Sequence, residues 1–128
     1  MIYSLSTDFL IRLKNGSLVD RKTITAPLSK FCVAMAELIK KYGYIEDYSV
    51  SEADKEITVT LAYPNGSRAI NSVQLFSRPG RRIYEKSFSL PWGKTKQSLI
   101  IISTSSGLMS QKDAKKRGLG GEVIAEIL

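Results

Sequence analysis

The spacing of apolar positions predicts two helices in the first part of the chain. Apolar residues recur every three to four positions within residues 4–15, and Gly16 follows as a natural end for that helix. A longer apolar stripe predicts a second helix at about 29–42, which Ser29 would cap and Gly43 would end.

Alternating and β-branched runs predict four strands around these helices. They lie at 22–27, 44–50, 56–63 and 68–76. The last two flank "PNG", whose turn chemistry predicts that they pair as a hairpin. Residues 1–76 are therefore expected to form an N-terminal α-β-α-β-β-β domain.

"SRPG" at 77–80 predicts a domain boundary, because Pro and Gly interrupt regular structure there. Residues 77–128 are expected to be mostly β with one short helix. A buried strand is expected at 98–103, a helix at 111–117 between a Ser110 cap and Gly118, and a last strand at 122–128 with Val123, Ala125 and Ile127 on one face. The predicted fold class is α+β, with two small domains.

Charge is unevenly distributed between the two predicted domains. Residues 1–76 carry nine Lys or Arg and eight Asp or Glu, a net charge of +1, whereas residues 77–128 carry ten and four, a net charge of +6. A basic surface attracts polyanions, nucleic acid first and anionic membrane second. The second domain, residues 77–128, is therefore the expected RNA-binding part.

Composition excludes several kinds of site. The chain has no His, which excludes Ser–His–Asp and Cys–His catalysis. Its single cysteine, Cys32, excludes an internal disulfide and is expected to be a buried structural thiol. No apolar run approaches the ~20 residues of a membrane span, and no N-terminal stretch has the features of a secretion signal. We expect no metal and no cofactor.

Three motifs in the basic half offer candidate contacts. "STSSGLMS" (103–110) follows the most apolar run, and its small side chains predict either a polar turn or a place where RNA approaches closely. "RPGRRIY" (78–84) and "KDAKKRGLGG" (112–121) offer cations for phosphate and a tyrosine face for a base. Taken alone, the first motif is more typical of a solvated basic turn and the second of a helix end.

These motifs, in this order, resemble the universal small-subunit ribosomal protein eight family, in its bacterial or organellar form. The resemblance covers nearly the whole chain. It is strongest in "RLKNG" (12–16), "PLSK" (27–30), "YGYIEDY" (42–48), "SRPGRRIY" (77–84), "STSSGLMS" (103–110) and "RGLGGEVIAEIL" (117–128). It implies a non-enzymatic structural protein of the small subunit, a primary binder that organises the central domain of small-subunit rRNA among neighbouring ribosomal proteins.

The resemblance also implies which residues face RNA. The family's S-T-S-x-G loop, which meets the minor groove of an irregular stem, matches Ser103, Thr104, Ser105 and Gly107, while Ser106 stands where a lysine is usual. The tyrosine after the R-P-G turn matches Tyr84, the acid of the G-G-E turn matches Glu122, and Arg12 and Lys30 match basic N-terminal positions. With the basic motifs, the expected RNA-binding set is Arg12, Lys30, Arg78, Arg81, Arg82, Tyr84, Ser103, Thr104, Ser105, Ser106, Gly107, Lys115, Lys116 and Glu122.

The family pattern is not complete. The usual "DPI" before Asp8 is absent, and "GKTKQS" (93–98) replaces a glycine-rich approach to the strand. This drift is typical of an organelle or of a reduced genome. The expected place is therefore a ribosome of the bacterial cytoplasm, or of the mitochondrial matrix or plastid stroma. Two other classes of protein stay open from sequence: an enzyme with a Ser105–Lys112 dyad, and a basic membrane-surface protein.

Overall fold

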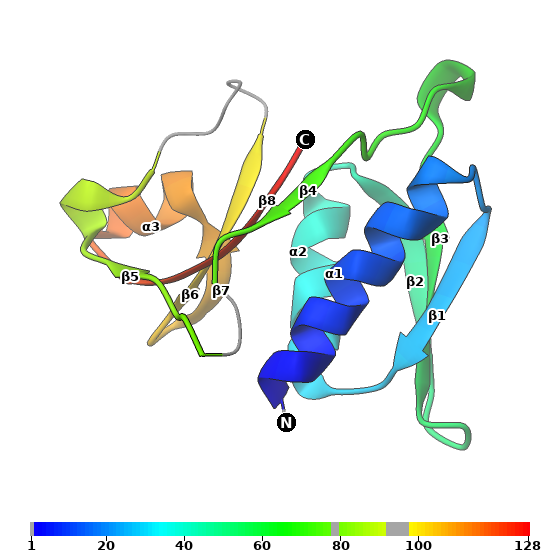
Figure 1. The fold of residues 1–128 in the computed structure, drawn as a ribbon, viewed down its shortest axis with the longest axis horizontal. Helices are drawn as coiled ribbons and strands as arrows, with labels where there is room; N and C mark the ends of the chain where they lie inside the picture. Colours follow the sequence, from blue (N-terminus) through cyan, green and yellow to red (C-terminus); the bar gives the residue numbers. More distant parts are fainter. Residues whose placement is uncertain (1, 78–79, 92–97) are drawn as a thin grey trace. The chain divides into compact units, whose positions relative to one another are not determined.

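The computed structural model describes residues 2–77, 80–91 and 98–128, and for residues 2–6 the backbone alone. In these ranges the chain forms three α-helices and eight strands, which make two antiparallel sheets (Figure 1). It divides into two compact units, Met1–Ser72 and Val73–Leu128. The expected α+β class, with an α/β first part and a mostly β second part that carries a short helix, is confirmed.

The first helix, α1 (Ile2–Leu18), is longer than predicted, because Gly16 lies inside it. A Cβ atom at Gly16 would lie 2.4 Å from Cγ2 of Ile24 in β1 (Thr23–Pro27). Glycine is thus needed here for close packing of helix and strand and does not end the helix.

The chain leaves α1 at Asp20, which has a left-handed φ of 56°. The N–H groups of Asp20 and Arg21 donate to the carbonyls of Ser17 (3.2 Å) and Gly16 (2.9 Å). This pair of bonds is the usual helix-ending pattern, and Asp tolerates the left-handed conformation better than most residues. The sequence prediction ended this helix at Gly16 because glycine is the usual residue at a helix end, whereas the residue that ends it is Asp20.

The second helix, α2 (Lys30–Lys41), begins and ends where the sequence predicted. The Oγ atom of Ser29 accepts a hydrogen bond from the backbone N–H of Cys32 at 3.1 Å, and Gly43 follows the helix with a φ of +80°. Cys32 is fully buried, and burial raises the pKa of its thiol. The expectation of a buried structural thiol is therefore confirmed.

The N-terminal sheet contains β1, β2 (Ile45–Ser51) and β3 (Glu56–Leu61) in the order β1-β3-β2. Side chains alternate between buried and exposed along β1 and β3, and α1 and α2 pack on the buried face (Figure 1). Both edges of β3 are occupied, so the predicted pairing of 68–76 with 56–63 is wrong. The expected "PNG" turn is a 3-10 turn, Pro64–Gly66.

Only Val73–Leu75 of the predicted 68–76 strand is extended, and this strand, β4, pairs with β8 (Gly121–Ile127) in the second sheet. The observed division after Ser72 therefore lies four residues before the boundary that we expected after residue 76.

The C-terminal sheet has the order β4-β8-β6-β7, and β5 (Tyr84–Glu85) also pairs with β8. Strands β6 (Leu99–Thr104) and β7 (Gly107–Ser110) form a hairpin. A 3-10 turn, η2 (Ser87–Ser89), follows β5.

Helix α3 (Gln111–Arg117) confirms the predicted short helix of the second part. The Oγ atom of Ser110 accepts from the backbone N–H of Asp113 at 3.2 Å, and Gly118 ends the helix with a left-handed φ of 69°. The helix packs on β6 and β7, over a core formed by Leu90, Ile100, Ile102, Met109, Ala114 and Val123.

A bulge in β8 changes which of its side chains share a face. Ile101 pairs with Ala125, but the next residue, Ile102, pairs with Val123. Ile101 and Ile102 are neighbours in β6, so their side chains point to opposite faces of the sheet. Each shares its face with its partner, and Ala125 and Val123 therefore also point to opposite faces. The prediction of one shared face for Val123, Ala125 and Ile127 is wrong, and the whole segment Val123–Ile127 is buried.

Candidate nucleic-acid interface

Three of the expected RNA-binding residues form a row across the C-terminal sheet. Glu122 of β8 is paired with Tyr84 of β5 on one side and with Ser103 of β6 on the other. Paired residues of neighbouring strands project from the same face of a sheet. We call Tyr84, Glu122 and Ser103 the polar row.

The central carboxylate of the polar row has an unsatisfied oxygen. Oε2 of Glu122 is buried and has no hydrogen-bond partner among the residues that the structure describes. A buried acceptor without a donor is costly, and few occur in folded proteins. The position therefore suits a ligand that brings a hydroxyl or amino hydrogen.

Tyr84 is the aromatic end of the polar row, with 62% of its surface exposed. Its place is fixed by the buried Ser77, whose Oγ donates to the carbonyl of Val123 at 2.7 Å and accepts from the N–H of Ile83 at 2.9 Å. Ile83 also accepts through its carbonyl from Val123 N–H at 2.8 Å. Ser77 thus closes the loop before β5 and presents the tyrosine ring to solvent.

The hydroxyl segment is a hairpin, not an extended loop. Ser103 and Thr104 belong to β6 and Gly107 belongs to β7, so only Ser105 and Ser106 form the turn. Gly107 has a φ of +112°, which explains the glycine.

The hydroxyls of the run differ in their hydrogen bonds within the protein. The Thr104 hydroxyl accepts from the Ser106 N–H at 3.1 Å and donates to the Gly107 carbonyl at 2.8 Å, so it holds the turn together. Ser105 and Ser106 are exposed, and their side chains make no hydrogen bond within the described part of the chain. Thr104 therefore has a structural role in closing the turn, and its contact with RNA stays a prediction.

A glycine lets β8 lie close to β6 next to the polar row. A Cβ atom at Gly121 would lie 2.1 Å from the carbonyl oxygen of Ser103. The sequence indicated only that "GLGG" follows a helix end. The structure shows that Gly121 is needed for β8 to approach β6 next to Glu122.

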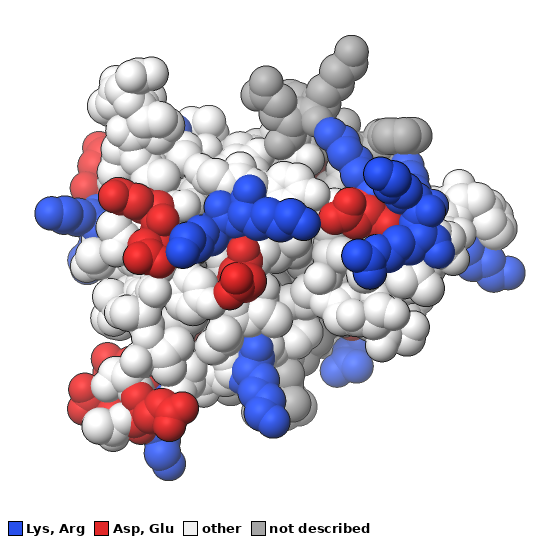
Figure 2. Space-filling view, turned by 180° about the vertical axis from the view of Figure 1, so that it is seen from behind, with Lys and Arg blue, Asp and Glu red and all other residues white. Residues whose placement is uncertain are grey.

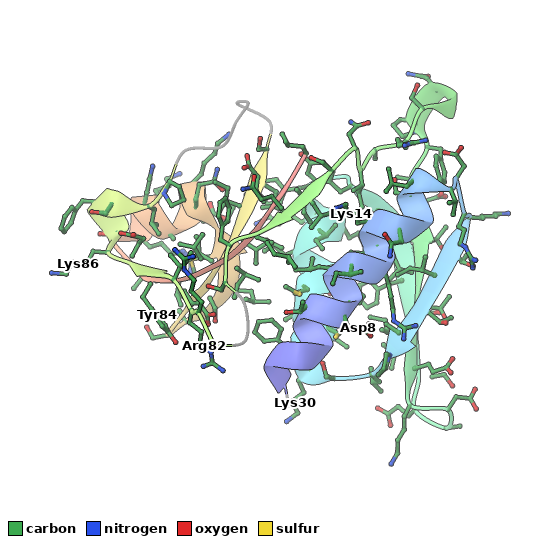
Figure 3. The ribbon with its side chains drawn as sticks, viewed as in Figure 1. Asp8, Lys14, Lys30, Arg82, Tyr84 and Lys86 are labelled. Carbon is green, nitrogen blue, oxygen red and sulfur yellow. The ribbon has the colours of Figure 1, made fainter. Side chains whose placement is uncertain are left out.

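Basic residues gather on the C-terminal unit, as Figure 2 shows on one face. Lys116 and Arg117 are exposed on α3, whereas Lys115 is partly buried and has an interaction within the protein. Arg81 and Arg82 are exposed just before β5. Arg82, Tyr84 and Lys86 follow one another along this segment in Figure 3. Arg78 lies outside the described residues.

The two expected contacts of the N-terminal unit differ from each other. The Arg12 guanidinium is bound to the Asp8 carboxylate at 2.8 Å and to the Thr25 carbonyl at 3.0 Å, and it therefore fastens α1 to β1. Lys30 is exposed at the start of α2 (Figure 3). Of these two, Lys30 is the cation that can turn freely toward a phosphate.

The geometry does not favour the Ser105–Lys112 dyad. Ser105 precedes β7 and Lys112 follows it, and a four-residue strand spans about 13 Å. No cluster of three metal-ligating side chains occurs in residues 2–77, 80–91 and 98–128. In the same ranges, no helix is both long and apolar enough to cross a membrane.

Comparison with known proteins gives one consistent family. The model of a family described as ribosomal protein S8 matches residues 5–128. Proteins called small ribosomal subunit protein uS8 are similar over most of their length: that of Bifidobacterium longum subsp. infantis is 46% identical over 121 residues, 92% of each chain. The protein from Vibrio atlanticus is 42% identical over 122 residues, 94% of each chain.

Proposed function

The chain belongs to the ribosomal protein S8 family, and from this premise we propose how it acts in the small ribosomal subunit. As a member of this family it is a structural protein of the small subunit, and binding to rRNA fits that role. We propose further that it is a primary binder of the central domain of small-subunit rRNA, and that its contribution to the ribosome is architectural and not enzymatic.

The polar row is the observation that carries the proposal. Tyr84, Glu122 and Ser103 come from three strands, yet their pairing brings them to neighbouring positions on one face. An exposed ring, a buried acceptor without a donor and a small hydroxyl suit an unstacked base beside a ribose 2′-hydroxyl. The Ser105–Ser106 turn lies beyond the row and supplies two further exposed hydroxyls.

Recognition would proceed by shape more than by base sequence. The major groove of A-form RNA is deep and narrow, whereas its minor groove is shallow and displays 2′-hydroxyls. Lys116, Arg117 and the arginines before β5 would attract the phosphates, and the polar row would then select the irregular part of the stem. Lys30 of the N-terminal unit would add a phosphate contact.

The relatives named above are bacterial, and they favour a bacterial ribosome as the place where the protein acts. An organellar origin has no support from them, so we do not extend the proposal to it.

Binding to a panel of rRNA fragments tests the proposal. Fragments that together cover the central domain, and matched fragments of the other small-subunit domains, are titrated with the full chain. One irregular stem of the central domain should bind much more tightly than all others. Tyr84→Ala should lose most of this preference, because each base stacked on an aromatic ring is worth about 1–3 kcal/mol. Equal binding to every fragment would contradict the proposal.

A further inference from the structure

Phe88 is the most exposed large apolar residue in the described part of the chain, at 81%. It lies in η2, directly after β5. Together with Tyr84 it lines an open groove of about 630 Å³. The other lining residues are Glu85, Lys86, Ser87, Gly118, Gly120 and Gly121.

The exposure of Phe88 is not that of a loosely attached loop. The N–H of Ser89 donates to the Lys86 carbonyl at 2.9 Å and closes the turn. Leu90, two residues after Phe88, is only 3% exposed and belongs to the core under α3. The ring is thus held out in solvent by a segment that is fastened at both sides.

The two walls of the groove are also fixed to each other. A Cβ atom at Gly120 would lie 2.5 Å from the Glu85 carbonyl oxygen and 2.8 Å from Cα of Lys86. The glycine segment and the β5–η2 segment therefore pass in direct backbone contact, and the groove is formed before any ligand arrives.

We propose that this groove receives a second unstacked base of the rRNA, with Phe88 as its stacking surface and Lys86 beside its phosphate. This inference rests on the proposed function, because Tyr84 belongs to both the polar row and the groove. An RNA strand that runs from the polar row past Tyr84 would enter the groove that Tyr84 and Phe88 line together.

Size and charge favour a nucleotide over a protein partner. The volume lies in the ~300–1,000 Å³ range of small-ligand sites. Apart from Phe88 and Tyr84, the lining is glycine, serine and one side chain of each charge, Glu85 and Lys86, and Arg117 precedes Gly118 in the sequence. Exposed rings beside a lysine suit a base with its phosphate.

The first test compares variants of the full chain on the central-domain rRNA stem that the parent binds best. Phe88→Ala should weaken binding about 5- to 150-fold, the range for loss of one stacked base. Phe88→Tyr keeps the ring and should keep the affinity, whereas Phe88→Leu keeps an apolar side chain and should lose it. Leu18→Ala, at an exposed apolar position at the end of α1, is the matched control and should bind as the parent does. Unchanged binding by Phe88→Ala, or full binding by Phe88→Leu, would overturn the inference.

The second test identifies what lies against residue 88 in the assembled subunit. The photoreactive amino acid benzoylphenylalanine replaces Phe88 in the full chain, which is then incorporated into small subunits and irradiated. Crosslinks to a nucleotide of the rRNA support the inference. Crosslinks to a ribosomal protein alone would overturn it and assign Phe88 to a protein contact.

These outcomes separate the inference from the function on which it rests. If the parent chain prefers no rRNA fragment, the proposed function fails and the inference fails with it. If the parent binds and Tyr84→Ala weakens binding while Phe88→Ala does not, the proposed function stands and only the second base site is wrong.

Discussion

The single carboxylate at the centre of the polar row allows a sharp test at the residue scale. Oε2 of Glu122 is buried without a donor from the residues that the structure describes, so Glu122→Gln replaces an acceptor with an amide of the same shape. Specific binding to the central-domain stem should fall by about 1–3 kcal/mol, because a donor on the RNA is left unpaired. Binding to unrelated duplex RNA should rise slightly, because one negative charge is removed. Both affinities are measured by titration at fixed salt.

Glu46→Gln is the matched control, since it removes an exposed carboxylate of β2, outside the row and the groove. It should raise both affinities slightly and leave the preference unchanged. A parallel rise for Glu122→Gln would show that this carboxylate acts only through its charge.

Two neighbouring hydroxyls should respond in opposite ways. Ser105→Ala removes an exposed hydroxyl that has no partner among residues 2–77, 80–91 and 98–128, so the melting temperature should stay the same while specific binding falls by about 1–3 kcal/mol. Thr104→Ala removes two hydrogen bonds of the turn and should lower the stability by about 0.5–1.5 kcal/mol. Thr104→Ser restores the hydroxyl and should recover most of that loss.

The measurements are thermal melting by circular dichroism and RNA titration at a temperature where every variant is folded. A Ser105→Ala protein that binds the stem as well as its parent would leave the turn with a structural role only.

At the scale of elements, the approach of β8 to β6 depends on one missing side chain. Gly121→Ala would place a Cβ atom 2.1 Å from the Ser103 carbonyl oxygen, so the strands must move apart. We expect a loss of about 1–3 kcal/mol in stability, as for other overpacked sites, and a disordered polar row that binds rRNA poorly even when the protein is folded.

Gly43→Ala provides the comparison. Gly43 has a φ of +80° after α2, and a Cβ atom there would meet nothing within 4 Å. The strained backbone should cost about 1–2 kcal/mol, with no effect on rRNA affinity below the melting temperature. If both variants bound RNA equally well, the spacing of β8 and β6 would be irrelevant to recognition.

At the scale of the whole molecule, the uneven charge predicts where salt sensitivity originates. Lys116 is exposed on α3 in the basic C-terminal unit, and Lys22 is exposed in the nearly neutral N-terminal unit. If Lys116 neutralises a phosphate, Lys116→Ala should reduce the slope of log affinity against log salt by up to ~0.9, the duplex value for one contact. Lys22→Ala should leave the slope close to that of the parent.

The slope is obtained from titrations of the same stem at four or more salt concentrations. If Lys116→Ala and Lys22→Ala gave the same slope of log affinity against log salt, Lys116 of α3 would not neutralise a phosphate.

Some parts of this protein could be predicted from sequence because their causes are local. The Ser29 and Ser110 caps, and the glycines that end α2 and α3, act within three or four residues of their partners, so the printed sequence contains the whole interaction. The excess of positive charge after residue 76 and the absence of His need no structure at all. The motifs around Tyr84, Ser103–Gly107 and Glu122 were also sufficient to indicate the family.

Other parts were decided by contacts between residues that are distant in sequence. Strand β4 pairs with β8 and not with its neighbour β3, because β1 and β2 already occupy both edges of β3. Gly16 and Gly121 are needed because another segment passes close to them, which their own neighbours in the sequence do not reveal.

The polar row is likewise a product of pairing. Tyr84, Ser103 and Glu122 are about twenty residues apart in the sequence, and only the pairing of β5, β8 and β6 makes them neighbours. A sequence determines a helix end or a net charge by itself, because the interacting groups are adjacent in the chain. It does not by itself fix which strands pair, because that choice depends on which edges the rest of the fold leaves open.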